Sequence, residues 1–103
     1  MNPRALPGAT ADITDIVDWL DQQPLRWGTR FRAALNTLVN RLCQQPRMYG
    51  RVSRAPRGRE VRVAPMRRFN YIVHYEVTAA EVVILSVVHA RRRAALWRHR
   101  LGP

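Results

Sequence analysis

The chain has 103 residues, a length that accommodates one domain with a single hydrophobic core. Hydrophobic residues make up 47% of it, which is enough for a folded core, and its 18 basic residues, all arginine, outnumber seven acidic ones. A single cysteine, Cys43, excludes a disulfide framework and a CxxC metal site. No apolar run approaches membrane-spanning length. We therefore expect a cytoplasmic protein without a metal or cofactor.

The positive charge is concentrated in the second part of the chain. Residues 1–45 hold five Arg and four Asp, a net charge of +1, whereas residues 46–103 hold thirteen Arg and three Glu, a net charge of +10. This segregation predicts that one region of the surface binds a polyanion or an acidic protein. A solvated surface without a binding role is the alternative.

The chain begins with a proline-rich stretch and an amphipathic helix. Residues 1–9 can supply only a short edge strand or an arm, because proline is excluded from central strands. A helix then begins at residues 10–11 and ends before Pro24, with one apolar stripe at i, i+3, i+4 and i+7. Asp12 and Asp15 near its start suit the positive end of the helix dipole.

The remaining elements are a second helix and three strands. The second helix begins near residues 27–29 and stops before Pro46, so the two helices form a hairpin. The period then changes from 3.6 to 2 in three runs, 59–65, 68–77 and 81–90. Their short connections indicate antiparallel neighbours.

The clearest strand, within "RRFNYIVHYEV" (67–77), has apolar or aromatic residues at alternate positions. Such a face could stack on nucleic-acid bases, but we interpret it as core packed against the helical hairpin. The run 81–90 is apolar on both faces, with Val83, Leu85 and Val87 on one of them, as in a central strand.

The chain ends in a basic tail. Its residues 90–103 predict a short basic amphipathic helix that Trp97 docks onto the body of the domain. The predicted fold is a single α+β domain, residues 1–103, with a two-helix hairpin on a small antiparallel sheet. One sheet face would stay partly open, and a site would form there.

The order of these segments resembles the RelE/ParE superfamily of bacterial toxins, and within it the ParE-like, plasmid-stabilisation branch. The resemblance covers about residues 9–100 and rests on the helix start "ATADITDI", on "DWL…QPLRWGTRF", "QQPRMYGRV" and "RRFNYIVHYEV", and on "VVILSVVHARR…WRHR". Members of this family usually begin with a clear edge strand, whereas residues 2–8 are proline-rich here.

The resemblance implies the toxin of a type II toxin–antitoxin pair, neutralised by an acidic, partly disordered antitoxin that folds on it. ParE-like toxins interfere with DNA gyrase, and RelE-like toxins cut messenger RNA on the ribosome. A non-toxic basic module that binds nucleic acid is a third hypothesis. Sequence leaves open whether the chain forms a homodimer or a heterotetramer with its antitoxin.

RNA cleavage requires a base, an acid and stabilisation of phosphorane charge, and arginine supplies only the last. The nuclease candidates are His89 as the proton-transfer group and Arg62 and Arg68 as the phosphate clamp. We expect His74 to be a surface or sheet-face residue and His99 to be a surface residue.

Gyrase inhibition requires a binding surface and no acid–base pair, so we favour a binding protein over an enzyme. If the chain is an enzyme, it is an endoribonuclease. The residues predicted to bind the target or antitoxin are Arg59, Arg67, Arg91, Arg92, Arg93, Trp97 and Arg98.

Overall fold

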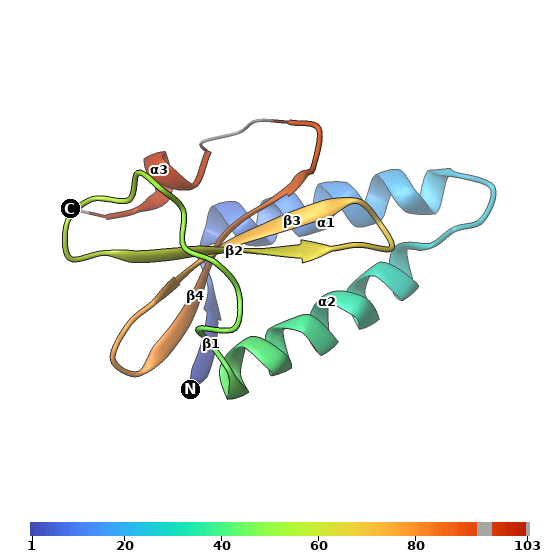
Figure 1. Cartoon of the computed structure of the whole chain (residues 1–103). Coiled ribbons are helices and arrows are strands. Elements are labelled where there is room, and N and C mark those ends of the chain that lie inside the picture. The colour runs from blue at the N-terminus through green and yellow to red at the C-terminus, as the bar shows by residue number, and fades with distance from the viewer. Residues whose placement is uncertain (93–95, 103) are drawn as a thin grey trace.

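The computed structural model describes residues 1–92 and 96–102, in which two long helices lie on one face of a four-stranded sheet (Figure 1). The elements follow in the order β1 (Asn2–Ala5), α1 (Pro7–Gln22), α2 (Gly28–Gln44), β2 (Glu60–Met66), β3 (Tyr71–Val77), β4 (Glu81–His89) and α3 (Leu96–Arg100). The strand order is β1-β4-β3-β2. The meander β2–β3–β4 is antiparallel, as predicted, whereas β1 pairs in parallel with β4 and makes the sheet mixed.

The proline-rich start forms the edge strand β1, which pairs with residues 81–84 of β4. The chain then enters α1 at Pro7, three residues before the predicted start at residue 10. Proline fits the first turn of a helix, where its missing N–H leaves no hydrogen bond unmade. The prediction was wrong here because it treated Pro7 as part of the arm.

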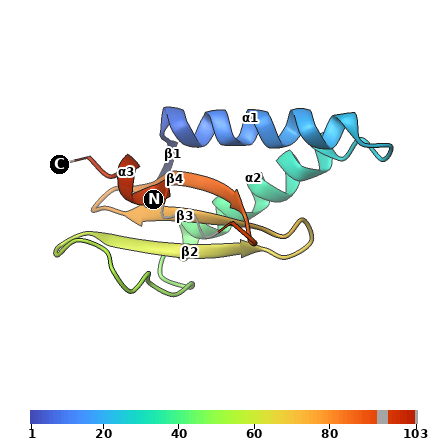
Figure 2. The same ribbon diagram turned by 90° about the horizontal axis from the view of Figure 1, so that it is seen from above.

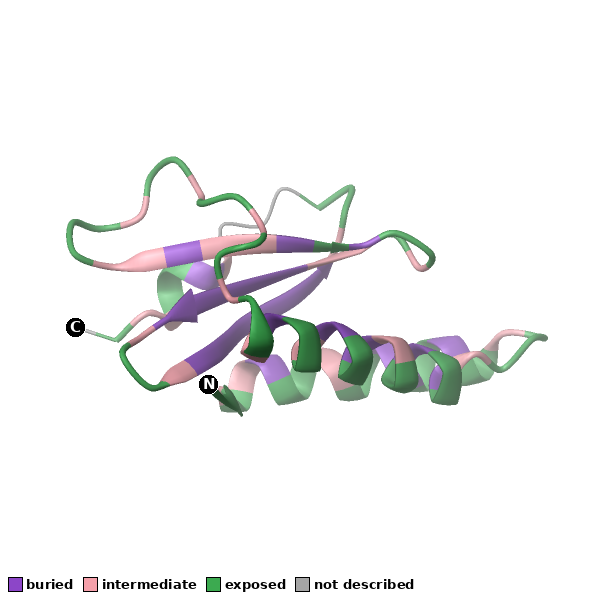
Figure 3. Cartoon of the chain, turned by 60° about the horizontal axis from the view of Figure 1, so that its bottom comes forward, coloured by how far each residue is buried: buried purple, intermediate pink, exposed green. Residues whose placement is uncertain are grey.

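The helical hairpin covers the sheet face that carries the alternate aromatic residues (Figures 2 and 3). Phe31 of α2 is fully buried and meets Phe69 and Tyr71 edge to face, with ring centroids 5.5 and 5.4 Å apart. Tyr75 is also fully buried, and its hydroxyl donates to the carbonyl of Pro46 at 2.8 Å. Burial raises the pKa of Tyr75 to about 12. The aromatic face is therefore core, as predicted.

The opposite sheet face is covered as well, contrary to the prediction of an open face. Trp97 of α3 packs there with Val61, Val83 and Leu85. The helix predicted within residues 90–103 forms only in part in the described residues, because residues 90–91 form a turn and α3 covers Leu96–Arg100. Residues 93–95 and 103 of this predicted helix lie outside the described residues.

A bulge in β4 changes which side chains face the helices. His74 pairs with Ser86 but Tyr75 pairs with Ile84, so Leu85 is the extra residue. Val87 consequently joins the core under the helices instead of sharing a face with Leu85, as strict alternation had predicted.

Two charged side chains bind the edge of β4 beyond the end of β1. The Val87 N–H donates to Asp12 Oδ2 at 3.0 Å, and Arg100 Nη1 donates to the Leu85 carbonyl at 2.9 Å. Arg100 also forms a two-pronged ion pair with Asp12, at 2.6 and 3.1 Å. A Cβ on Gly8 would lie 2.6 Å from Arg100 Nε, so the glycine makes room for this guanidinium.

We expect Asp12→Ala to lower the free energy of unfolding by about 2–4 kcal/mol, because it leaves a backbone N–H and a partly buried guanidinium unpaired. The measurement is equilibrium urea unfolding. Asp18→Ala, on the exposed side of the same helix, is the control and should change it by less than about 0.5 kcal/mol. Equal effects of the two substitutions would show that the Asp12 ion pair adds nothing to stability.

Candidate functional site

A cleft of about 810 Å³ lies between α1 and the end of β4. Its lining is mostly apolar and aromatic, with charged residues from α1 and from the segment after β4. The lining residues are Asp12, Asp15, Ile16, Trp19, Leu20, Phe69, Tyr71, Val87, Val88, His89, Arg91, Arg92 and Leu96. Trp19 is 55% exposed at its border. The cleft thus offers apolar surface next to two exposed arginines.

His89, the predicted proton-transfer group, lies in the wall of this cleft at the end of β4. Its ring meets Tyr71 edge to face at 5.3 Å, and its Nδ1 accepts the Arg91 backbone N–H at 3.2 Å. Burial raises the pKa of Tyr71, although the charge of Arg92 opposes this. His89 therefore adjoins a phenol and two guanidinium-bearing residues.

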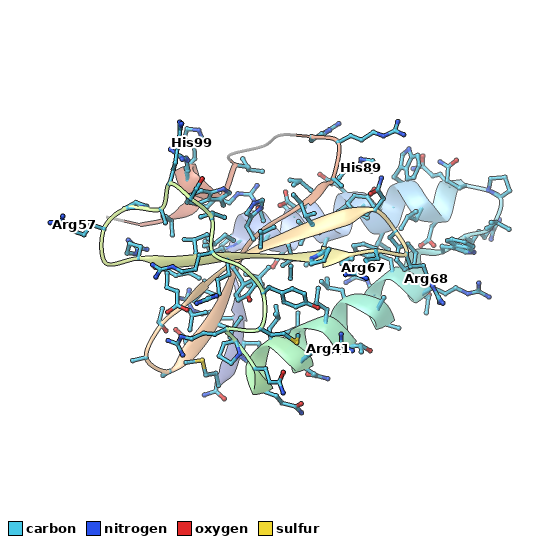
Figure 4. All side chains as sticks on the ribbon, viewed as in Figure 1. Arg41, Arg57, Arg67, Arg68, His89 and His99 are labelled. Atoms are coloured by element: carbon cyan, nitrogen blue, oxygen red, sulfur yellow. The ribbon has the colours of Figure 1, made fainter. Side chains whose placement is uncertain are left out.

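The two arginines predicted to clamp phosphate do not lie together with His89. Arg62 is opposite Tyr75 and His89 is opposite Tyr71, which separates them by four residues, about 13 Å, along the strands. Arg62 is also engaged, because it donates to Glu60 at 2.7 Å and to the Tyr49 carbonyl at 2.6 Å. Arg68 lies exposed in the β2–β3 turn, at the His89 end of the sheet (Figure 4).

The predicted partner-binding residues divide between the two ends of the sheet. Arg67, Arg91 and Arg92 are exposed at one end, where the Ala90 N–H donates to the Asn70 carbonyl at 2.8 Å and joins their segments. Arg59, Trp97 and Arg98 belong to the other end, and Arg93 lies outside the described residues.

The residues at the second end have structural contacts. Arg59 forms a two-pronged ion pair with Glu76 and donates to the Gly102 carbonyl at 2.8 Å. Trp97 is only 5% exposed, so it is a core residue and not a free contact surface. The guanidinium of Arg98 lies 5.1 Å from the Trp97 ring.

A single cationic region was expected from the sequence, and this expectation was wrong. Arg57 precedes β2, whereas Arg67 and Arg68 follow it, and Figure 4 shows them at opposite ends of the molecule. The sequence showed the charge difference between its two parts, but β2 carries the chain from one end of the sheet to the other. A run of arginines in sequence is thereby divided in space.

Sequence reasoning missed two further arginines at the cleft end, Arg26 and Arg30. Both are exposed, and the Arg30 guanidinium lies 5.8 Å from the Trp27 ring. Trp27 in turn meets Phe69 of the β2–β3 turn at 5.9 Å. The spacing of three residues between Trp27, at the N-cap of α2, and Arg30 was the feature of the sequence that could have indicated this contact.

Within the described part of the chain, no carboxylate pairs with the six arginines of this end, Arg26, Arg30, Arg67, Arg68, Arg91 and Arg92.

His74 lies on the sheet face that Trp97 covers, which is one of the two positions expected for it, and it is buried there. It stacks on Trp97 with ring centroids 6.0 Å apart, and its Nδ1 lies 3.3 Å from Ser86 Oγ. Burial lowers the pKa of His74 to about 4. His99 is exposed, as expected.

Residues 1–92 and 96–102 contain no group of three His, Cys, Asp or Glu side chains placed to hold a metal ion. No helix among them is long and apolar enough to cross a membrane.

A two-helix hairpin on a small mixed sheet, with a cleft at one end that two arginines line, defines a small basic α+β protein. The family model of the ParE toxin of type II toxin–antitoxin systems (parDE) matches residues 4–94. The chain belongs to this ParE family, and it is a toxin component of the type II toxin–antitoxin class. No curated protein gives a significant match.

Two solved structures show the same fold. A chain of the chromosomal ParDE toxin–antitoxin system from P. aeruginosa is 22% identical, with a TM-score of 0.71, over 88% of this chain and 97% of that one. The isolated E. coli RelE toxin is 16% identical, with a TM-score of 0.59, over 95% of this chain and 92% of that one. The fold resemblance to the RelE/ParE superfamily inferred from sequence is thereby confirmed.

The buried imidazole of His74 should make stability depend on pH. Its pKa is about 4 in the folded chain and 6.5 in the unfolded chain, so between these values the unfolded state binds more protons. The free energy of unfolding should therefore fall as the pH is lowered from about 6.5 to 4, by up to about 3 kcal/mol. Urea unfolding across this range measures it.

The control is a comparison of two histidine substitutions. His74→Gln should flatten this part of the pH profile, whereas His99→Gln, at an exposed position, should leave it unchanged. An unaltered profile in His74→Gln would show that His74 does not cause the dependence.

Proposed function

We propose that the chain arrests bacterial growth by binding and inhibiting DNA gyrase, and that an acidic cognate antitoxin neutralises it. Family membership supports the toxin role, and ParE-like toxins act on gyrase. Inhibition by binding needs a preformed surface and no acid–base pair. The cleft offers apolar surface beside Arg91 and Arg92, which suits such binding.

The six unpaired arginines at the cleft end carry this proposal. They come from three separate segments, the α1–α2 turn with the start of α2, the β2–β3 turn, and the chain after β4. Arginine is always charged and is enriched among residues that dominate protein interfaces. Their position at one end of the molecule, with Arg91 and Arg92 in the same cleft lining as exposed Trp19, supports a role in binding an acidic protein surface.

The cleft has the properties required to bind the antitoxin. Its apolar lining would receive one face of an amphipathic segment, and Arg91 and Arg92 would pair with the carboxylates of that segment. A disordered antitoxin would lose conformational entropy when it orders there, and the apolar burial offsets that cost.

We expect the purified toxin to inhibit gyrase supercoiling, and the double substitution Arg91→Glu/Arg92→Glu to weaken inhibition by about tenfold or more, because it reverses two charges at the interface. Arg57→Glu at the opposite end of the molecule is the single-charge control and should retain inhibition. A wild-type protein that leaves supercoiling and cleavage-complex formation unchanged would rule out gyrase as the target.

Ribosome-dependent cleavage of messenger RNA is the second candidate, because His89, Tyr71 and Arg92 share one wall of the cleft. Arg68 lies at the same end of the sheet, but Arg62 cannot be part of this set. In this case the wild-type protein would leave gyrase supercoiling unchanged, and His89→Gln would abolish both toxicity and message cleavage. A fully toxic His89→Gln variant, with translated messages left uncut, would exclude it.

A further inference from the structure

The α1–α2 turn presents the most exposed large apolar side chain of the described residues. Leu25 is 68% exposed, and Trp19 one turn before the end of α1 is 55% exposed. A small hollow of about 320 Å³ is bounded by Leu20, Gln23, Pro24, Leu25 and Trp27. The turn extends beyond the end of the sheet in both Figure 1 and Figure 2 and forms one extremity of the molecule.

This turn is held in one conformation by several local contacts. The Gly28 N–H donates to Asp21 Oδ1 at 3.0 Å, and a Cβ on Gly28 would lie 2.4 Å from the same oxygen. The Gln23 side-chain amide donates to the Trp19 carbonyl at 3.2 Å.

Arg26 shows that the turn conformation is imposed on the chain. It has a φ of 48°, in the left-handed region that side chains other than glycine rarely adopt. Its N–H donates to the Gln23 carbonyl at 3.0 Å. An exposed leucine held in a strained, fixed turn is preorganised for a partner, because little conformational freedom remains to be lost on binding.

The charges around Leu25 indicate the chemistry of that partner. Arg26 lies in the turn, and Arg30 lies in the first turn of α2. Arg67 and Arg68 lie in the adjoining β2–β3 turn, whose Phe69 contacts Trp27. Counted against Asp18 and Asp21, these four arginines leave a local net charge of +2. An apolar pocket bordered by carboxylates is the complement of this surface. A nucleic acid would pair with the arginines but would gain little from Leu25.

We infer that the α1–α2 turn is a docking surface, separate from the cleft, that inserts Leu25 into an apolar, carboxylate-bordered pocket of the toxin's target protein. The inference rests on the proposed toxin function. Leu25 does not line the cleft, so its substitution tests the turn while the cleft stays intact. Arginine is enriched among the residues that dominate protein interfaces, and the arginines beside Leu25 supply that part of the surface.

The test is growth arrest on controlled expression, together with gyrase supercoiling by the purified variants. Leu25→Ser should reduce both activities by about tenfold or more, whereas Met48→Ser should change them less than about twofold. Met48 is the matched control, because it is 43% exposed and lies on the connection between α2 and β2. Thermal unfolding of each variant checks that the fold is retained.

A charge pair of variants tests the arginine border. Arg30→Glu should weaken both activities, and Arg57→Glu, at the other end of the molecule, should not. If wild type inhibits gyrase and Leu25→Ser inhibits it equally, the docking surface is refuted and the gyrase proposal stands.

The remaining outcomes also decide the inference. If wild type arrests growth without affecting gyrase, the target assignment fails, and loss of arrest in Leu25→Ser still supports the docking surface. If wild type causes no arrest, both proposals fall. Binding to DNA or RNA that Arg30→Glu and Arg57→Glu weaken equally, and Leu25→Ser leaves unchanged, would identify a polyanion-binding surface and refute the inference.

Discussion

The ion pair between Asp12 and Arg100 joins α1, near the start of the sequence, to β4 and α3, near its end. Asp12 belongs to α1, Arg100 to α3, and both bind backbone groups of β4 beyond the end of β1. The side chains of Asp12 and Arg100 are mostly shielded from water. Removing one of them would therefore leave the charge of the other buried without a partner, which costs more free energy than the loss of a surface contact. The placement of α3, and with it the seating of Trp97 on the second sheet face, depends on this link.

The acidic residues of the chain determine which arginines are structural. All three glutamates and Asp12 are in ion pairs, and their partners are Arg4, Arg47, Arg59, Arg62 and Arg100. Burial acts to raise the pKa of Glu60, but the hydrogen bonds from Arg62 and Arg47 outweigh it and the pKa is lowered. None of these five arginines lines the cleft, and the six arginines of the cleft end pair with no carboxylate within the described residues.

Much of the fold could be predicted from the sequence, because periodicity reports which side chains are buried. The alternation in 67–77 and the helical stripe ending at Leu42 each define one apolar face, and each is core. The bulge at Leu85 could not be predicted, since a strand that is apolar on both faces gives no sign of a change in alternation. The site was only partly predictable for a similar reason: sequence gives the number of arginines but not the end of the sheet at which each lies.

The cleft and the α1–α2 turn share the last turn of α1, because Leu20 lines both the cleft and the hollow beside Leu25. A segment bound in the cleft would contact Trp19 and Leu20, and it would place its own bulk and negative charge beside the turn. It would therefore weaken docking of an acidic target at the turn without covering Leu25, which does not line the cleft. Neutralisation of such a toxin needs only adjacency of the two surfaces, and a shared helical turn provides it.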